Sequence, residues 1–150
     1  MNILIIGFGS IGQRHLKNLI DNFQDNNYFV LKNTDNNIVI QDCKIIENET
    51  IKSFYSGVEF YQNLDDIDLE FIDVAFICND SSKHLDIAFS LLENNIDMFI
   101  EKPIDSNFDK VIRFNDMLSK TNAIVMIGYQ MRFHPVYEKI REIFFNIKND

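Results

Sequence analysis

The feature that most constrains this chain is a glycine-rich motif next to its N-terminus. The six positions of the motif are Gly7, Phe8, Gly9, Ser10, Ile11 and Gly12, which fit the pattern G-x-G-x-x-G. An apolar run over residues 2–6 comes before it, and an apolar stripe with helical spacing, Leu16 to Phe23, comes after it. A strand, a glycine-rich turn and a helix in this order are typical of a dinucleotide-binding fold.

Each glycine of the motif has a physical role in such a turn. The first makes the tight turn, the second lets the backbone approach a pyrophosphate, and the third lets the helix pack against the strand. The helix N-terminus then offers unpaired N–H groups and a partial positive charge to the phosphates. Two other interpretations stay open: a merely tight turn between a strand and a helix, and the glycine-rich first loop of a methyltransferase.

Apolar runs and helical stripes alternate along most of the chain. Strands are expected at residues 28–31, 58–61, 71–78, 98–100 and 123–127, and helices begin near residue 63 and cover 85–92 and 108–118. This alternation predicts an α/β protein with a Rossmann-type doubly wound parallel sheet. The Asn- and Asp-rich segment 33–57 is harder to order. It is compatible with short strands at 38–40 and 44–46 and a helix over 51–55, and an insertion is one interpretation of it.

The tail of the chain follows a different pattern from the rest. From Pro135 onward a long apolar stripe runs to Ile147, after the last strand of a complete sheet. We interpret residues 1–131 as the dinucleotide-binding domain and residues 132–150 as the linker and first helix of a truncated second domain. The pattern alone equally allows a helix that folds back on the sheet.

Charge and composition exclude several classes of partner. The chain has 14 Lys and Arg against 23 Asp and Glu, a net charge of −9, so nucleic acid and anionic membranes are poor partners. No run approaches the roughly 20 apolar residues of a membrane helix.

The two cysteines make no disulfide framework, and Cys78 is expected to be a buried thiol. The three histidines share no metal-ligand spacing, so no metal is predicted. A soluble, cytoplasmic protein is expected.

The choice of dinucleotide depends on the end of the second strand, about 20 residues past the third glycine. An acidic residue at that point would bind the ribose 2′-hydroxyl of NAD, but this sequence has Lys32 there and Asp35 slightly later. Since a cation suits the 2′-phosphate of NADP, the sequence leans slightly to NADP over NAD. If Asp35 turns inward, the preference reverses.

Three polar segments follow successive predicted strands farther along, at residues 78–84, 101–103 and 128–135. Together with the glycine motif they resemble the Gfo/Idh/MocA oxidoreductases, which include glucose–fructose oxidoreductase and inositol dehydrogenase. The stretches that carry the resemblance are GFGSIGQRHLKNL, FICNDSSKHLDIAFSLLENNIDMFIEKPI and IGYQMRFHPV. With their connections they cover nearly the whole chain outside residues 33–57.

The resemblance implies roles for several residues beyond the glycine turn. Cys78, Asn79 and Asp80 match the family's cofactor loop after the fourth strand, although the family usually has a proline at the Asp80 position. Glu101 and Lys102 match the family's E-K-P motif, whose lysine lies beside the nicotinamide and the substrate hydroxyl. The proline of that motif, here Pro103, is often in a cis peptide bond.

Further residues of these segments are given weaker roles. Arg132 lies where the family's chain enters its second domain and can face substrate. His84 is included on the cofactor side, although a helix-start residue that bonds nearby backbone is its ordinary interpretation. His15 is expected to be structural, and Lys102 has the alternative of being a surface lysine before a turn proline.

Hydride transfer from a secondary alcohol needs a proton acceptor on the oxygen, and a partly desolvated lysine at a strand end can fill that role. The sequence therefore predicts the nucleotide-binding half of an NAD(P)-dependent oxidoreductase. The expected substrate is a small polar carbohydrate-like molecule, a sugar, cyclitol or sugar nucleotide, changed at a hydroxyl or keto carbon. A homo-oligomer of the full-length protein is also envisaged. The alternative is a non-catalytic sensor or regulatory module that binds NAD(P).

Overall fold

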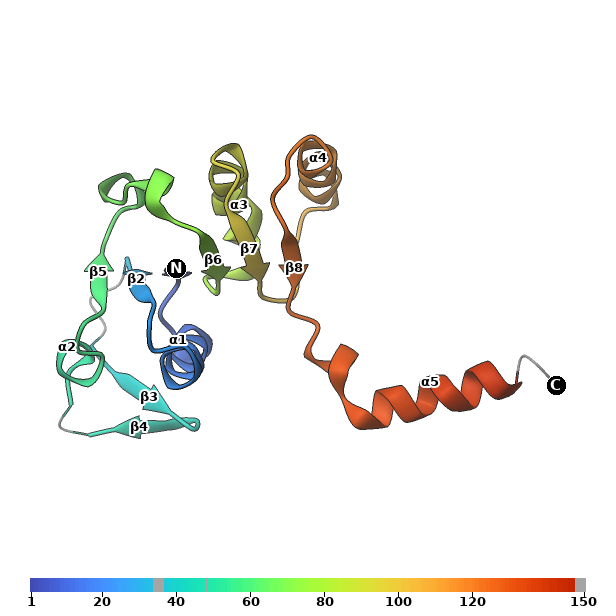
Figure 1. Ribbon diagram of the computed structural model, residues 1–150, viewed down its shortest axis with the longest axis horizontal. Helices are drawn as coiled ribbons and strands as arrows, with labels where there is room; N and C mark the ends of the chain where they lie inside the picture. Colours follow the sequence, from blue (N-terminus) through green and yellow to red (C-terminus); the bar gives the residue numbers. More distant parts are fainter. Residues whose placement is uncertain (34–36, 48, 148–150) are drawn as a thin grey trace.

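A six-stranded parallel sheet forms the centre of the computed structural model, which describes residues 1–33, 37–47 and 49–147. Its strands are β1 (Asn2–Ile6), β2 (Asn27–Leu31), β5 (Glu59–Tyr61), β6 (Val74–Ile77), β7 (Asp97–Ile100) and β8 (Val125–Ile127). They lie in the order β5-β2-β1-β6-β7-β8 (Figure 1). Counted along the chain, this is the 3-2-1-4-5-6 order of the Rossmann fold. The predicted fold class is therefore confirmed.

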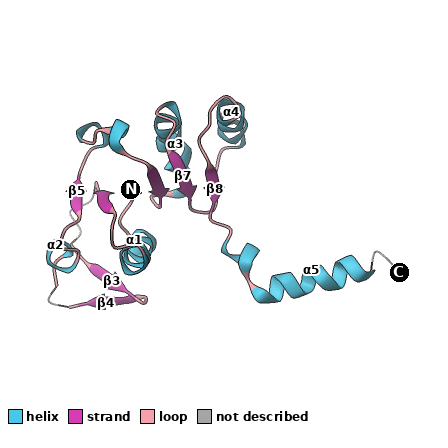
Figure 2. Ribbon diagram, viewed as in Figure 1, coloured by secondary structure: helices cyan, strands magenta, loops and turns pink. Residues whose placement is uncertain are grey.

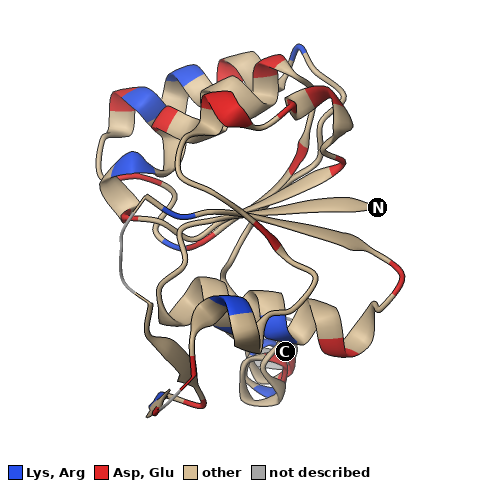
Figure 3. Cartoon of the chain, turned by 90° about the vertical axis from the view of Figure 1, so that its left-hand side faces the viewer, with Lys and Arg blue, Asp and Glu red and all other residues tan. Residues whose placement is uncertain are grey.

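Helices cover both faces of the sheet, as Figure 3 shows edge-on. Helix α1 (Ser10–Asn22) packs on one face, where Ile3 and Ile5 of β1 point. Helices α3 (His84–Glu93) and α4 (Phe108–Leu118) pack on the other face, against Leu4 and Ile6. Because both faces of β1 are buried, its sequence is continuously apolar instead of alternating.

The segment after β2 forms a hairpin and a short helix. Strands β3 (Val39–Gln41) and β4 (Lys44–Ile46) pair antiparallel, and α2 (Ile51–Phe54) follows (Figure 2). The buried amide of Gln13 in α1 attaches the hairpin: its Nε2 donates to the Ile38 carbonyl at 2.9 Å, and its Oε1 accepts from the Ile40 N–H at 2.8 Å. The pair of short strands expected here is present.

Two expected elements are shorter in the structure than in the sequence pattern. The predicted strand over residues 71–78 is paired only as Val74–Ile77, and Leu69–Phe71 before it forms a 3-10 turn (η2). Asp68 starts that turn, because its side chain accepts the Glu70 N–H at 3.1 Å. The helix expected near residue 63 is likewise a single 3-10 turn, η1 (Leu64–Asp66).

The last helix, α5 (Pro135–Ile147), extends away from the sheet (Figure 1). It follows the 3-10 turn η4 (Gln130–Phe133). The side chains of its stripe, Val136, Ile140, Ile143 and Phe144, are 44–64% exposed. The tail therefore does not fold back on the sheet, and a domain boundary at residue 131 stays a prediction. No helix within the described ranges has the length and apolar character needed to cross a membrane.

Candidate functional site

The glycine turn lies between β1 and α1, at the carboxyl edge of the sheet. Gly7 has a φ of +85°, and a Cβ there would lie 2.5 Å from the backbone nitrogen of Asn79. A Cβ on Gly12 would lie 2.0 Å from the carbonyl oxygen of Gly7. Gly9 is different, because nothing lies within 4 Å of its Cβ position. The chain itself therefore requires glycine at positions 7 and 12, whereas Gly9 leaves its backbone open to a ligand.

A pocket of about 290 Å³ opens above this turn. Its lining includes the turn, the end of β2, the hairpin and the loop after β6, through Gly7, Phe8, Gly9, Gln13, Lys32, Asn33, Ile38, Ile40, Cys78, Asn79, Asp80 and Lys83. The side-chain oxygen Oδ1 of Asn79 is buried here and has no hydrogen-bond partner within the described part of the chain. An open glycine backbone and an unsatisfied polar atom fit a dinucleotide whose phosphates and ribose supply the missing partners.

The other motif residues contribute in different ways. The Phe8 ring is buried and packs edge-on against Tyr55 and Phe60, with centroids 5.4 and 5.5 Å away. Only the backbone of Phe8 is therefore suited to the phosphates. Ser10 and Ile11 are exposed in the first turn of α1, and Ile11 lines the neighbouring pocket.

We name the neighbouring pocket, of about 410 Å³, the nicotinamide-side pocket, after the role that the resemblance implies for Lys102 in its lining. It is lined by Ile11, Arg14, His15, Cys78, Asn79, Ser81, His84, Glu101, Lys102 and Gln130. The sequence analysis placed six of these in the site: Ile11, Cys78, Asn79, His84, Glu101 and Lys102. It missed Arg14, Ser81 and Gln130, and it treated His15 as structural. Their position along the chain could have identified them: Arg14 and His15 follow the glycine motif directly, and Ser81 and Gln130 lie inside the polar segments 78–84 and 128–135.

His15 and Glu101 form the closest side-chain contact of this pocket. The His15 Nε2 lies 2.9 Å from Glu101 Oε1, across 86 residues of sequence. The second carboxylate oxygen, Oε2, accepts the backbone N–H of Lys102 at 3.2 Å. Both side chains are mostly buried. The carboxylate therefore has a partner on each oxygen.

His84 is almost fully buried, with 1% of its surface exposed. Its Nδ1 lies 2.8 Å from the Pro103 carbonyl oxygen, and its Nε2 lies 2.9 Å from the Asn79 carbonyl oxygen. The ordinary interpretation of His84, a helix-start residue bonded to backbone, agrees with this geometry. A direct contact of its nitrogens with a cofactor does not, because both nitrogens are occupied.

Lys102 itself is exposed at the mouth of the pocket, and its peptide bond to Pro103 is cis. No element of the described residues covers its side chain, and the expected partial desolvation of this lysine stays a prediction. Neither a hydrogen bond nor an ion pair holds its ammonium group within the described ranges.

Cys78 ends β6 between the two pockets and lines both. Burial, together with the negative charge of Glu101, raises the pKa of its thiol from 9.0 to about 12. The thiol is therefore protonated at neutral pH and is not an activated nucleophile. The cysteine expected to be buried has intermediate exposure, because it lines both pockets.

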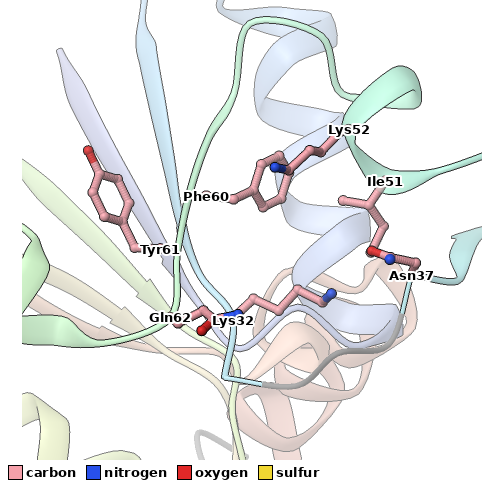
Figure 4. Close-up of a pocket in the computed structure, with 7 residues that line it drawn as sticks. All are labelled: Lys32, Asn37, Ile51, Lys52, Phe60, Tyr61 and Gln62. Carbon is pink, nitrogen blue, oxygen red and sulfur yellow. The ribbon is translucent and has the colours of Figure 1, made fainter.

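Lys32 lies at the end of β2 and lines the glycine-turn pocket and a second hollow of about 260 Å³. Figure 4 shows Lys32 in that hollow with Lys52 of α2, near Asn37 and the Phe60 ring. Lys52 was not singled out from the sequence. Asp35, on which the NAD alternative depends, lies outside the described residues.

The remaining predicted residues lie at the rim. Asp80 is exposed beside the glycine-turn pocket, with its carboxylate 3.9 Å from the Lys83 ammonium. Arg132 is exposed in η4 and lines neither pocket. Over residues 1–33, 37–47 and 49–147, no three His, Cys, Asp or Glu side chains gather in a way that could hold a metal ion.

Comparison with known proteins gives a consistent result. The family model GFO_IDH_MocA, described as an oxidoreductase family with an NAD-binding Rossmann fold, matches residues 1–129. The myo-inositol 2-dehydrogenase of Thermotoga maritima is 24% identical over 145 residues, which are 95% of this chain and 40% of that protein. The uncharacterized oxidoreductase YrbE of Bacillus subtilis is 26% identical over 146 residues, covering 93% and 38%.

Solved structures share the fold at lower identity. Apo scyllo-inositol dehydrogenase from Lactobacillus casei matches with a TM-score of 0.78 at 22% identity, over 99% of this chain and 42% of that one. UDP-N-acetylglucosamine 3-dehydrogenase GnnA from Acidithiobacillus ferrooxidans matches with a TM-score of 0.70 at 19% identity, over 95% and 43%. The chain thus spans about two fifths of the length of the relatives that it matches.

Proposed function

This chain belongs to the Gfo/Idh/MocA oxidoreductase family, and we propose that it forms the nucleotide-binding half of an enzyme that moves a hydride between NAD(P) and a hydroxyl or keto carbon. One observation carries the proposal. Lys102 is exposed and has no side-chain partner among the described residues, and it lies at the mouth of a pocket that shares Cys78 and Asn79 with the pocket above the glycine turn. A dinucleotide whose phosphates lie on the turn has the second pocket within reach of its other end.

In this proposal the residues of the chain divide the work. The open backbone at Gly9 and the N-terminus of α1 bind the pyrophosphate, and Asn79 offers its unsatisfied oxygen to the ligand. Bound NAD(P) supplies the hydride acceptor or donor. Lys102 exchanges the proton of the substrate oxygen, because no group in the described part of the chain engages its ammonium. Glu101 does not take that role, since both of its oxygens already accept hydrogen bonds.

The proposed substrate is a sugar, cyclitol or sugar nucleotide. Support comes from relatives whose names give inositols and a UDP-sugar as their substrates. Arg132 and the exposed stripe of α5 lie on the segment that leaves the sheet. We assign residues 132–150 to the start of a substrate domain, which would complete the site.

The preference for NADP over NAD is a finer proposal. The family description names NAD, and one relative, the scyllo-inositol 2-dehydrogenase of Bacillus subtilis, is specified for NAD(+), so the comparisons do not favour NADP. The two cations in the hollow at the end of β2, Lys32 and Lys52, are the feature that supports it. NADPH should then bind more tightly than NADH, and Lys32→Ala should remove most of the difference. Tighter binding of NADH by the unaltered chain would contradict the preference.

The main test is a fluorescence titration of this chain with NADH and NADPH, followed by turnover assays of the full-length gene product. Binding of either nucleotide, and loss of at least about 100-fold in kcat for Lys102→Ala, are expected for an enzyme that loses its proton-transfer group. Absence of nucleotide binding would overturn the proposal. Binding with no turnover on any polyol or sugar nucleotide would favour the sensor alternative.

The cytoplasmic location, the homo-oligomer and the exclusion of nucleic acid and membrane partners are predictions from the sequence. They rest on the net charge of −9 and on ordinary composition. Size-exclusion chromatography with light scattering measures the oligomeric state of the full-length protein directly.

A further inference from the structure

We propose that His15 and His84 are positioning residues that hold the turn Glu101–Lys102–Pro103 from both sides, and so fix Lys102 at the nicotinamide-side pocket. This proposal rests on the proposed function, because it concerns how the same site is kept in shape. The two histidines come from different helices, α1 and α3, and neither is used by the chemistry described above.

We call the contacts of His15 and His84 with the Glu101–Lys102–Pro103 turn the clamp. Its first side is the contact between His15 and Glu101. The ring reaches Glu101 Oε1 at 2.9 Å, and Glu101 Oε2 accepts the N–H of Lys102 at 3.2 Å. The carboxylate therefore links α1 directly to the backbone of the lysine. The ring of His15 also packs against Phe76 and Phe99, with centroids 5.5 and 5.1 Å away, which limits its rotation.

Gly128 at the end of β8 leaves the space that Glu101 occupies. A Cβ on Gly128 would lie 3.4 Å from Glu101 Oε2 and 2.9 Å from Cζ of Phe99. The Gly128 N–H donates to the Ile100 carbonyl at 2.8 Å, so the end of β8 is fixed beside the turn. The carboxylate is therefore confined by strand and helix and has one arrangement that satisfies both of its oxygens.

The second side of the clamp is His84. It binds the Pro103 carbonyl with one ring nitrogen and the Asn79 carbonyl with the other, at 2.8 and 2.9 Å. Both carbonyl oxygens only accept, so the ring donates its N–H to one of them and lies in contact with the other. His84 thus joins the end of the Glu–Lys–Pro turn to Asn79, which lines both pockets.

Lys102 lies between two residues that are anchored in this way, and its own side chain is not. Such an arrangement fixes the backbone while leaving the ammonium available, which is what a proton-transfer group requires. Loss of either anchor is expected to widen or shift the nicotinamide-side pocket. Loss of the His15–Glu101 contact should leave the glycine turn unaffected, because within the described residues that contact joins Glu101 to α1 and does not involve Gly7 or Gly9. Loss of His84 should also disturb Asn79, which packs beside Gly7.

The test compares two ligands on this chain: NADH, which has a nicotinamide ring, and ADP-ribose, which lacks one. His15→Ala and Glu101→Ala should each weaken NADH binding about tenfold, the scale of one charge-assisted hydrogen bond, and change ADP-ribose binding less than twofold. The double variant should lose no more than either single variant, because they remove the same contact. Glu101→Gln keeps an oxygen acceptor and should retain NADH binding within about threefold.

Two controls separate positioning from general damage. His134→Ala changes an exposed histidine just after η4, whose Nδ1 accepts the Val136 N–H at 3.2 Å, and should alter neither affinity. His84→Gln changes the ring that contacts Asn79, a residue that lines both pockets, and should therefore weaken the binding of both ligands, provided that circular dichroism shows a folded chain. If it does not fold, the His15 and Glu101 variants decide alone.

Equal losses for both ligands in the His15 and Glu101 variants would overturn the clamp, and so would no loss for either. A failure of the proposed function looks different, because the unaltered chain would then bind neither ligand. In the full-length protein, an intact clamp also predicts that His15→Ala lowers kcat more than it raises KM.

Discussion

The glycine turn and the Glu–Lys–Pro turn lie at the same edge of the sheet, but different kinds of contact hold their shapes. In the first, backbone packs against backbone: a Cβ on Gly12 would lie 2.0 Å from the Gly7 carbonyl oxygen. In the second, side chains from distant segments hold the shape, as His15 does across 86 residues. Changes in the first region should therefore act through sterics, and changes in the second through lost hydrogen bonds.

The largest effect is expected at Gly12. Gly12→Ala forces a methyl group against backbone that cannot rotate away, so the free energy of unfolding should fall by about 3 kcal/mol or more. Urea denaturation followed by circular dichroism measures the change. A loss under 1 kcal/mol would mean that α1 moves easily relative to β1 and that the turn is not a rigid backbone contact.

A smaller loss is expected at His84, in the region held by side chains. His84→Ala removes a buried ring whose nitrogens lie 2.8 and 2.9 Å from the Pro103 and Asn79 carbonyl oxygens, which should lower the free energy of unfolding by about 2–3 kcal/mol. The matched control, His134→Ala, should change it by no more than about 0.5 kcal/mol. Equal values for the two variants would show that the buried ring contributes nothing that an exposed one does not.

Cys78 lies between the two regions and should make stability depend on alkaline pH. Its pKa is raised from 9.0 to about 12 in the folded chain, so the unfolded chain loses the proton first as pH rises. The stability that the protonated thiol contributes is fully present below pH 9 and is lost progressively as pH rises to the folded pKa. The loss at pH 10 is about 1.4 kcal/mol. Cys78→Ala should reduce the fall in unfolding free energy between pH 8 and pH 10 by that amount. The remaining fall includes Tyr55, whose pKa burial also raises to about 12.

Gly9 should give the smallest change in stability and still affect binding. Since nothing lies within 4 Å of its Cβ position, Gly9→Ala should alter the free energy of unfolding by no more than about 0.5 kcal/mol. Its methyl group would nevertheless stand where a pyrophosphate must approach, so NADH affinity should fall at least tenfold. An unchanged NADH affinity of Gly9→Ala would mean that the phosphates bind elsewhere. Gly9 would then not differ from Gly12 in serving the ligand instead of the fold.

Much of the fold followed from local patterns. Strand β1 is buried on both faces and β6 and β7 are buried on one face and partly covered on the other, so all three contain apolar runs, and α1, α3 and α4 appear as stripes with helical spacing. The glycine motif was equally visible, because steric demand at Gly7 and Gly12 is met by one residue type. The run at residues 71–78 was assigned too long, because a strand and the apolar end of a 3-10 turn share the same composition.

Only some residues of the nicotinamide-side pocket could be predicted from the sequence. Glu101 and Lys102 stand out through their proline, but the partner of Glu101 is fixed by how α1 crosses the sheet, which local spacing does not contain. The burial of the Phe8 ring was not predicted for the same reason, and the sequence left Lys102 open between a partly desolvated lysine and a surface lysine. Burial and exposure depend on which elements cover a residue in three dimensions and not on its neighbours along the chain.

The exposed stripe of α5 has a consequence for how copies of this chain behave in solution. Apolar surface of this kind favours self-association, whereas a net charge of −9 keeps copies apart. The repulsion weakens as ionic strength rises, since the screening length falls from about 10 Å at 0.1 M to about 3 Å at 1 M salt. Self-association of the chain should therefore depend on salt: we expect separate molecules in dilute buffer and aggregates at high salt.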